Sequence, residues 1–297
     1  MQYRKGAKLD SSQMGYGGGG AGGKIALGGG AGILVLILAL VFGLDPSALL
    51  GAADQTQQSQ QNQSAQTGNP WDACENAEDI ETNRDCRFVA YTNSIQAFWA
   101  TQLGDQYVMT TTTPFTGQTA TACGTATSDV GPFYCPADKI VYLDTSFFDQ
   151  MLTGQLGARG GDAAEAYVIA HEYGHHISNL IGTLGKAQAA GNQTGPNSPQ
   201  VKLELQADCF AGVWLANATN DPASPIEAIT QDDLNRAVDA AIAVGDDRIQ
   251  QMSTGGISPE SWTHGSSEQR KTWMARGYTT GDPNQCDTFA PGALTKA

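Results

Sequence analysis

The motif HEYGH, residues 171–175, constrains this chain more than any other stretch. It lies near the end of an apolar run that begins at Asp162 and reads DAAEAYVIAHEYGHHISNL. Two histidines four residues apart on a helix project from the same side, so their imidazole nitrogens can converge on one metal ion. Glu172 lies about 100° further round the helix, where its carboxylate can take a proton from a water molecule that the metal activates. The pattern therefore predicts a helix that carries two metal ligands, His171 and His175, and a general base.

A catalytic zinc site needs a third protein ligand and one open position. A second predicted helix, from about Ser198 to Asn217, carries Glu204 and Asp208 four residues apart on one face. We expect Glu204 to complete the site for Zn²⁺. We expect Asp208, one turn later, to accept the second ring N–H of a ligand histidine, which would fix the tautomer of that histidine.

Three motifs, HEYGHH, LELQADCFAGVW and THGSSEQR, together resemble the bacterial neutral zinc metallopeptidase family, whose members are membrane-anchored zincins with a glutamate ligand. The resemblance extends from the basic N-terminus to about Tyr278. It implies a zincin-like fold and a zinc-dependent peptide hydrolase. A zincin needs a donor for the oxyanion, and we expect His264, in the third motif, to be catalytic. A histidine in a surface turn is the alternative, and Arg270 could share this role or simply pair with a carboxylate.

The predicted function is that of a membrane-tethered zinc endopeptidase with peptide or protein substrates. The alternative is a non-catalytic, zinc-containing binding or scaffold protein, which would not need a carboxylate at Glu172. Nucleic acid is not expected as a partner, because the net charge of the chain is −14. The sequence specifies no oligomeric state.

Residues 25–44, IALGGGAGILVLILALVFGL, contain no charged side chain and are long enough to span a membrane. Basic residues precede this run and are absent directly after it, so the N-terminus should be cytoplasmic. A cleaved signal peptide is the alternative, although its apolar region is usually shorter. We therefore expect a cytoplasmic tail (1–24), a transmembrane anchor (25–44), a flexible linker (45–70) and a periplasmic or extracellular metallopeptidase domain (71–297).

All six cysteines lie after the apolar run. An even number of cysteines in an exported domain indicates disulfides. Proximity in the sequence predicts two bridges, Cys74–Cys86 and Cys123–Cys135, and leaves Cys209 to pair with Cys286. A cysteine-rich metal site is the alternative, but the chain contains no CxxC pair.

Further elements follow from the spacing of apolar residues. Residues 83–103 and 230–250 repeat apolar side chains at helical intervals, and residues 106–116 and 139–144 are rich in β-branched and aromatic types. Several helices and a small sheet predict an α+β domain. We expect residues 139–144 to form an edge strand that a substrate backbone could extend. An interior strand is the alternative.

Overall fold

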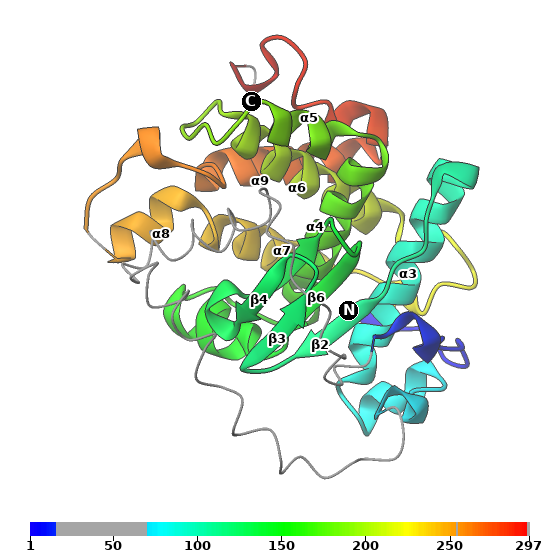
Figure 1. The fold of residues 1–297 in the computed structure, drawn as a ribbon. Coiled ribbons are helices and arrows are strands. Elements are labelled where there is room, and N and C mark those ends of the chain that lie inside the picture. The colour runs from blue at the N-terminus through cyan, green and yellow to red at the C-terminus, as the bar shows by residue number, and fades with distance from the viewer. Residues whose placement is uncertain (16–69, 254, 296–297) are drawn as a thin grey trace.

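The structure of this chain is a computed structural model, which describes residues 1–15, 70–253 and 255–295. The described residues form an α+β domain, as predicted, in which a small sheet lies against a group of helices (Figure 1). None of the helices in these ranges is both long and apolar enough to cross a membrane. The predicted anchor, residues 25–44, lies outside the described residues, as does nearly all of the predicted linker.

Helix α4 lies at the centre of the domain and packs against α3, α6, α7 and the sheet. Nearly all of its side chains are buried, and short ones such as Ala163, Ala166 and Ala170 allow its neighbours to approach closely. The helices of the domain are α3 (Cys86–Leu103), α4 (Asp162–Leu180), α5 (Thr183–Ala189), α6 (Pro199–Asn217), α7 (Gln231–Ala243), α8 (Asp246–Ser253) and α9 (Ser267–Thr280).

Glycines bring three of these helices into contact at the level of the backbone. On α4, a Cβ added at Gly174 would lie 2.7 Å from the Cα of Ala207 on α6. On α9, a Cβ added at Gly277 would lie 2.0 Å from the carbonyl oxygen of Cys209 on α6. Helix α6 is therefore held between α4 and α9 at distances that no larger side chain would permit.

The central sheet has three strands in the order β2-β6-β5, namely β2 (Thr112–Phe115), β6 (Ile140–Asp144) and β5 (Phe133–Cys135). Strand β6 pairs in parallel with β2 and antiparallel with β5. The prediction that residues 139–144 form an edge strand is therefore wrong, and the interior alternative is correct. Both sides of β6 are already hydrogen-bonded, so no substrate backbone can extend the sheet there. A hairpin of β3 (Gln118–Thr121) and β4 (Gly124–Thr127) follows β2.

The helix predicted over residues 230–250 is two helices, α7 and α8, with a break at Val244 and Gly245. The start of α9 causes the break, because a Cβ at Gly245 would lie 2.5 Å from the backbone nitrogen of Ser267. The backbone N–H of Asp246 leaves the helical pattern and donates to the carbonyl oxygen of Gly265 at 2.9 Å. Apolar spacing continues across this break and could not reveal it.

The three predicted disulfides are confirmed: Cys74–Cys86, Cys123–Cys135 and Cys209–Cys286. The last one joins α6 to the segment that follows α9, and it lies one residue after Asp208.

Residues 1–15, which we call the N-terminal segment, pack on the domain beside α3 (blue in Figure 1). Strand β1 (Gln2–Tyr3) pairs antiparallel with β7 (Ile226–Ala228), and the side chains of Leu9 and Met14 are buried in the core. We expected residues 1–24 to form a tail separate from the domain. The described part of that range is instead part of the domain, through contacts with residues far away in the sequence.

Candidate metal centre

The three predicted ligands come together between α4 and α6. Their ligand atoms all lie within 4.8 Å of one another. The Nε2 atoms of His171 and His175 are 3.1 Å apart, and Glu204 Oε2 and Oε1 lie 3.2 and 3.5 Å from them, respectively. Ligand atoms around a tetrahedral zinc ion with bonds near 2.0–2.1 Å would lie about 3.3 Å apart. The three side chains therefore fit a zinc ion in chemical type and in spacing.

Asp208 lies where it was expected, against the second ring nitrogen of His171. Its Oδ1 atom is 2.8 Å from His171 Nδ1 and also accepts hydrogen bonds from the hydroxyl of Tyr167 at 2.5 Å and from Arg270 Nη2 at 2.9 Å. When the imidazole is neutral and its Nδ1–H donates to Asp208, the lone pair lies on Nε2, the ring nitrogen next to Glu204 and His175. Burial alone would lower the pKa of His171, but the Asp208 carboxylate raises it to about 9.

Arg270 is only 3% exposed and pairs with Asp208, and its Nη1 lies 3.9 Å from Glu204 Oε2. We considered that Arg270 could share the role of oxyanion donor or pair with a carboxylate. The structure contains the ion pair with a carboxylate. Its positive charge lies close to the carboxylates of Asp208 and Glu204 and offsets part of their negative charge.

Glu172 lies on α4 between the two histidines in sequence and is 8% exposed. Its carboxylate makes no hydrogen bond to another described residue. Burial raises the pKa of Glu172, while the nearby His171 and His175 act in the opposite direction. A buried carboxylate beside the ligands, without a partner of its own, is free to exchange a proton with a molecule bound at the site.

His264 also reaches this site, from the loop before α9. Its Nδ1 atom lies 3.1 Å from Asp246 Oδ1, and its charge acts on Glu204. The carboxylate of Asp246 also accepts the backbone N–H groups of Thr263, His264 and Gly265 at 2.7–2.9 Å. Burial alone would lower the pKa of His264, but Asp246 raises it. One buried carboxylate thus fixes the loop and the imidazole together.

The fourth histidine, His176, is fully buried and lies off the ligand side of α4. Its Nε2 donates to the carbonyl oxygen of Val108 at 2.7 Å, and its Nδ1 lies 3.0 Å from the hydroxyl of Tyr134. This residue packs α4 against the sheet and is not a ligand.

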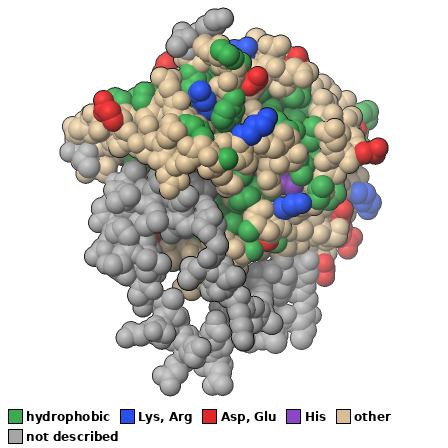
Figure 2. Space-filling model, turned by 45° about the horizontal axis from the view of Figure 1, so that its top comes forward, with side chains coloured by type: hydrophobic (Ala, Val, Ile, Leu, Met, Phe, Trp, Pro, Cys, Tyr) green, Lys and Arg blue, Asp and Glu red, His purple; other side chains and the backbone are tan. Residues whose placement is uncertain are grey.

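The site is open to solvent in part, because the side chains of His175 and His264 are 12% and 17% exposed. Figure 2 shows one face of the molecule, on which a histidine side chain (purple) is visible among hydrophobic side chains (green) and near a basic one (blue).

Sequence reasoning missed two residues of the site, Tyr167 and Asp246. Tyr167 precedes His171 by four residues, so helical spacing could have placed its hydroxyl beside the same partner. Asp246 follows a glycine at a helix start, and nothing in its local sequence indicates contact with a loop that begins 17 residues later. The structure brings the predicted site residues together around the ligands between α4 and α6, namely His171, His175, Glu172, Glu204, Asp208 and His264.

Comparison with known proteins gives a family and several relatives. The family described as putative neutral zinc metallopeptidase matches residues 3–289. An uncharacterized protein of Mycobacterium tuberculosis, Rv2575, is 44% identical over 261 residues, which cover 86% of this chain and 86% of the relative. The uncharacterized protein YpfJ of Escherichia coli is 39% identical over 284 residues, 91% of this chain and 90% of the relative. No solved structure is significantly similar to the chain.

Proposed function

This chain belongs to the family of putative neutral zinc metallopeptidases, and from this premise we propose that it is a membrane-attached, zinc-dependent endopeptidase of the zincin type, which hydrolyses peptide bonds outside the cytoplasm. One observation carries the proposal. Two imidazoles and a carboxylate converge at the spacing of zinc ligands. Beside them lies the buried carboxylate of Glu172, which makes no hydrogen bond to another described residue.

His171, His175 and Glu204 are the residues that would hold the metal, and Asp208 orients His171 through its Nδ1–H. A zinc ion bound there would polarise a water molecule and the peptide carbonyl, and would keep a position open for them. Glu172 accepts a proton from the attacking water and gives it to the leaving nitrogen of the peptide.

His264 supplies a donor for the oxygen that becomes negative as the carbonyl is attacked. Its Nδ1 is held by Asp246, and its Nε2 makes no hydrogen bond to any other described residue. Asp246 does not meet the substrate and acts by positioning His264.

Location outside the cytoplasm is supported by the three disulfides, since such bonds persist in oxidising compartments. Attachment to a membrane is supported by the uncharged apolar sequence of residues 25–44.

The deciding experiment compares wild type with Glu172→Gln in the full-length protein, by digestion of a peptide library and by metal analysis of the same samples. The substitution keeps size and removes basicity. We expect zinc content to stay and cleavage to fall by about 100- to 10,000-fold.

Glu268→Gln is the matched control, because Glu268 is exposed on α9 and, within the described part of the chain, its side chain pairs only with Lys271. It should cleave at the wild-type rate. If wild type and Glu172→Gln behave alike with zinc bound, the protein is a zinc-containing binding or scaffold protein, and the peptidase proposal is wrong.

A further inference from the structure

We propose that the N-terminal segment, residues 1–15, is a permanent part of the folded domain and lies on the same side of the membrane as residues 71–295. The proposal concerns the topology of the chain and does not depend on the metal centre or on peptidase activity. It replaces our expectation that the N-terminus is cytoplasmic while the domain is outside.

Backbone pairing holds this segment at three places. Near its start, β1 pairs with β7, and the N–H of Arg4 donates to the carbonyl oxygen of Pro225 at 2.8 Å. In its middle, Lys8 forms an antiparallel bridge with Asn76. At its end, the N–H of Gly15 donates to the carbonyl oxygen of Thr112 in β2 at 2.7 Å. A tail in loose contact with the surface would not form backbone hydrogen bonds with the domain along its whole length.

Side chains of the segment also enter the interior. Leu9 is 8% and Met14 is 4% exposed. The hydroxyl of Tyr3 lies 2.8 Å from that of Tyr91 on α3 and donates to Asp162, the first residue of α4, at 3.0 Å. The segment therefore contacts the helix that carries the metal ligands.

A second connection to that helix runs through Gln96 on α3. Its side-chain amide donates to Gln13 of the segment at 2.9 Å, and its oxygen accepts the backbone N–H of Thr110 at 3.0 Å. Thr110 lies two residues after Val108, whose carbonyl oxygen holds His176 on α4. The segment thus supports residues 108–110, which contact α4 through His176.

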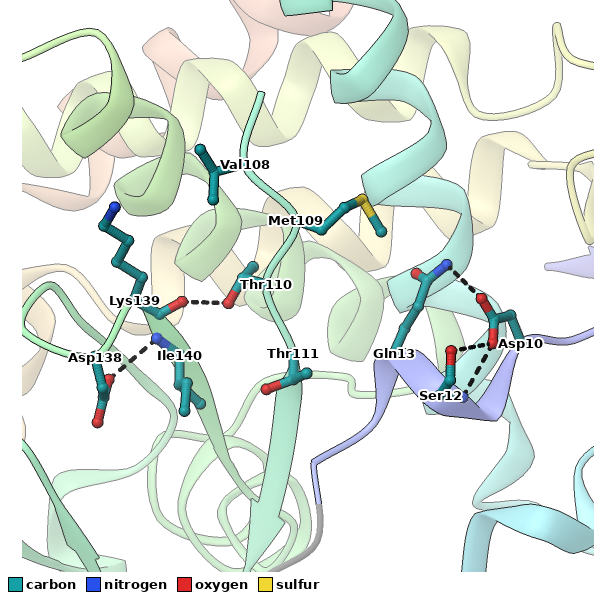
Figure 3. A pocket seen from close by; sticks show the side chains of 10 residues that line it. All are labelled: Asp10, Ser12, Gln13, Val108, Met109, Thr110, Thr111, Asp138, Lys139 and Ile140. Atoms are coloured by element: carbon teal, nitrogen blue, oxygen red, sulfur yellow. Dashed lines mark hydrogen bonds between the residues drawn. The ribbon is translucent and has the colours of Figure 1, made fainter. Parts of the chain in front are cut away.

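The N-terminal segment also forms part of the wall of a surface cavity of about 460 Å³ (Figure 3). Residues 108–111 and 138–140 form one part of its lining, and Asp10, Ser12 and Gln13 of the N-terminal segment form the other. Without the segment, the cavity would lose this wall, and the core residues of the domain that Leu9 and Met14 cover would be exposed.

Two of the basic residues that suggested a cytoplasmic N-terminus contact the domain in the structure. Arg4 Nε donates to the carbonyl oxygen of Ser224 at 3.0 Å, and Lys8 Nζ donates to Asn76 Oδ1 at 2.8 Å. These charged side chains attach the segment to the domain. Their position before an apolar run is therefore not evidence for the side of the membrane on which the N-terminus lies. A single crossing by residues 25–44 would separate the two partners of every contact above.

Cysteine cross-linking in the full-length, membrane-embedded protein tests the proposal. Gln2 and Ala228 face each other across β1 and β7. Gln2→Cys with Ala228→Cys should form a disulfide, detected as a linked peptide by mass spectrometry without reduction. In the control pair, Gln2→Cys with Glu227→Cys, the second residue is not the register partner of Gln2, because the pairing shifts at this point and skips Glu227, and linked peptide should be at least about tenfold less abundant.

The single variants Gln2→Cys and Glu227→Cys then report the side of the membrane, because both native side chains are exposed. In spheroplasts, a maleimide that cannot cross membranes should label both to the same extent. Labelling of Glu227→Cys in intact spheroplasts, with Gln2→Cys labelled only after lysis, would overturn the proposal. Absence of the 2–228 linked peptide would overturn it too, whatever the labelling result.

Discussion

Gly174→Ala tests whether the close approach of α4 and α6 builds the metal centre. The new Cβ would lie 2.7 Å from Ala207 Cα, 2.9 Å from its carbonyl oxygen and 3.0 Å from its Cβ. Carbon atoms in favourable contact are about 3.5–4.0 Å apart, so the two helices must separate by roughly 1 Å. Two of the three atoms belong to the backbone and the third is the Cβ of an alanine, so none of them can rotate away. Overpacking of this kind costs about 1–3 kcal/mol.

A second glycine provides the matched control. Gly185 lies in α5, is exposed, and has no atom within 4 Å of its would-be Cβ. Replacing a helical glycine by alanine stabilises by up to about 1 kcal/mol when nothing clashes. Both variants gain this stabilisation by alanine, so the difference between their free energies of unfolding measures the cost of the clash. Urea denaturation of the metal-free protein should show Gly174→Ala less stable than Gly185→Ala by about 1–3 kcal/mol.

The same displacement should weaken zinc binding, because His171 and His175 lie on α4 and Glu204 lies on α6. Metal–ligand distances tolerate only about 0.2 Å of change, so we expect affinity to fall at least tenfold, which equals about 1.4 kcal/mol. Competition with a coloured chelator measures this. If Gly174→Ala matched Gly185→Ala in stability and bound zinc like wild type, the contact between α4 and α6 would not be what positions the ligands.

Two further predictions concern other residues of the site, and a third concerns the buried His176. Glu204→Ala should lose zinc on dialysis, and full zinc content in this variant would exclude Glu204 as a ligand. Asp208→Ala should lower zinc affinity only about 10- to 100-fold. It should also destabilise the fold by about 3–5 kcal/mol, because the buried charge of Arg270 loses its partner. His264→Ala should lower kcat by about 100- to 1,000-fold and leave zinc bound, and an unchanged kcat would restrict His264 to a structural role. Burial lowers the pKa of His176, so as the pH falls the unfolded chain is protonated at this residue before the folded one. The free energy of unfolding should therefore decrease below about pH 6.5, by up to about 1.4 kcal/mol per pH unit until the pKa of the folded state is reached. His176→Gln should remove this part of the pH dependence in urea denaturation.

The residues of the metal centre could be predicted because the information is local. His171 with His175 and Glu204 with Asp208 are each one helical turn apart, and a turn fixes the relative direction of side chains without any knowledge of the tertiary structure. The cysteine pairs Cys74–Cys86 and Cys123–Cys135 were predictable for the same reason, since 12 residues separate each pair.

The failures all involve contacts between distant residues. Strand β6 has the composition of either an edge or an interior strand, and only its pairing with β2 and β5 decides between them. The break at Gly245 depends on Ser267, and Asp246 was missed because its partner His264 lies 18 residues later. The N-terminal segment is polar and rich in charge, so its composition gave no sign that Leu9 and Met14 would enter the core.

The hydrogen bond between Gly15 and Thr112 has a consequence for aggregation. Strand β2 forms one edge of the three-stranded sheet, and an uncovered edge can recruit a strand from another molecule. Met14 and Gly15 occupy this edge at Thr112, and Pro114 further along offers no N–H to an incoming chain. The opposite edge, β5, is only three residues long. The first residues of the chain thus help to keep copies of the protein from joining sheet to sheet in a crowded compartment.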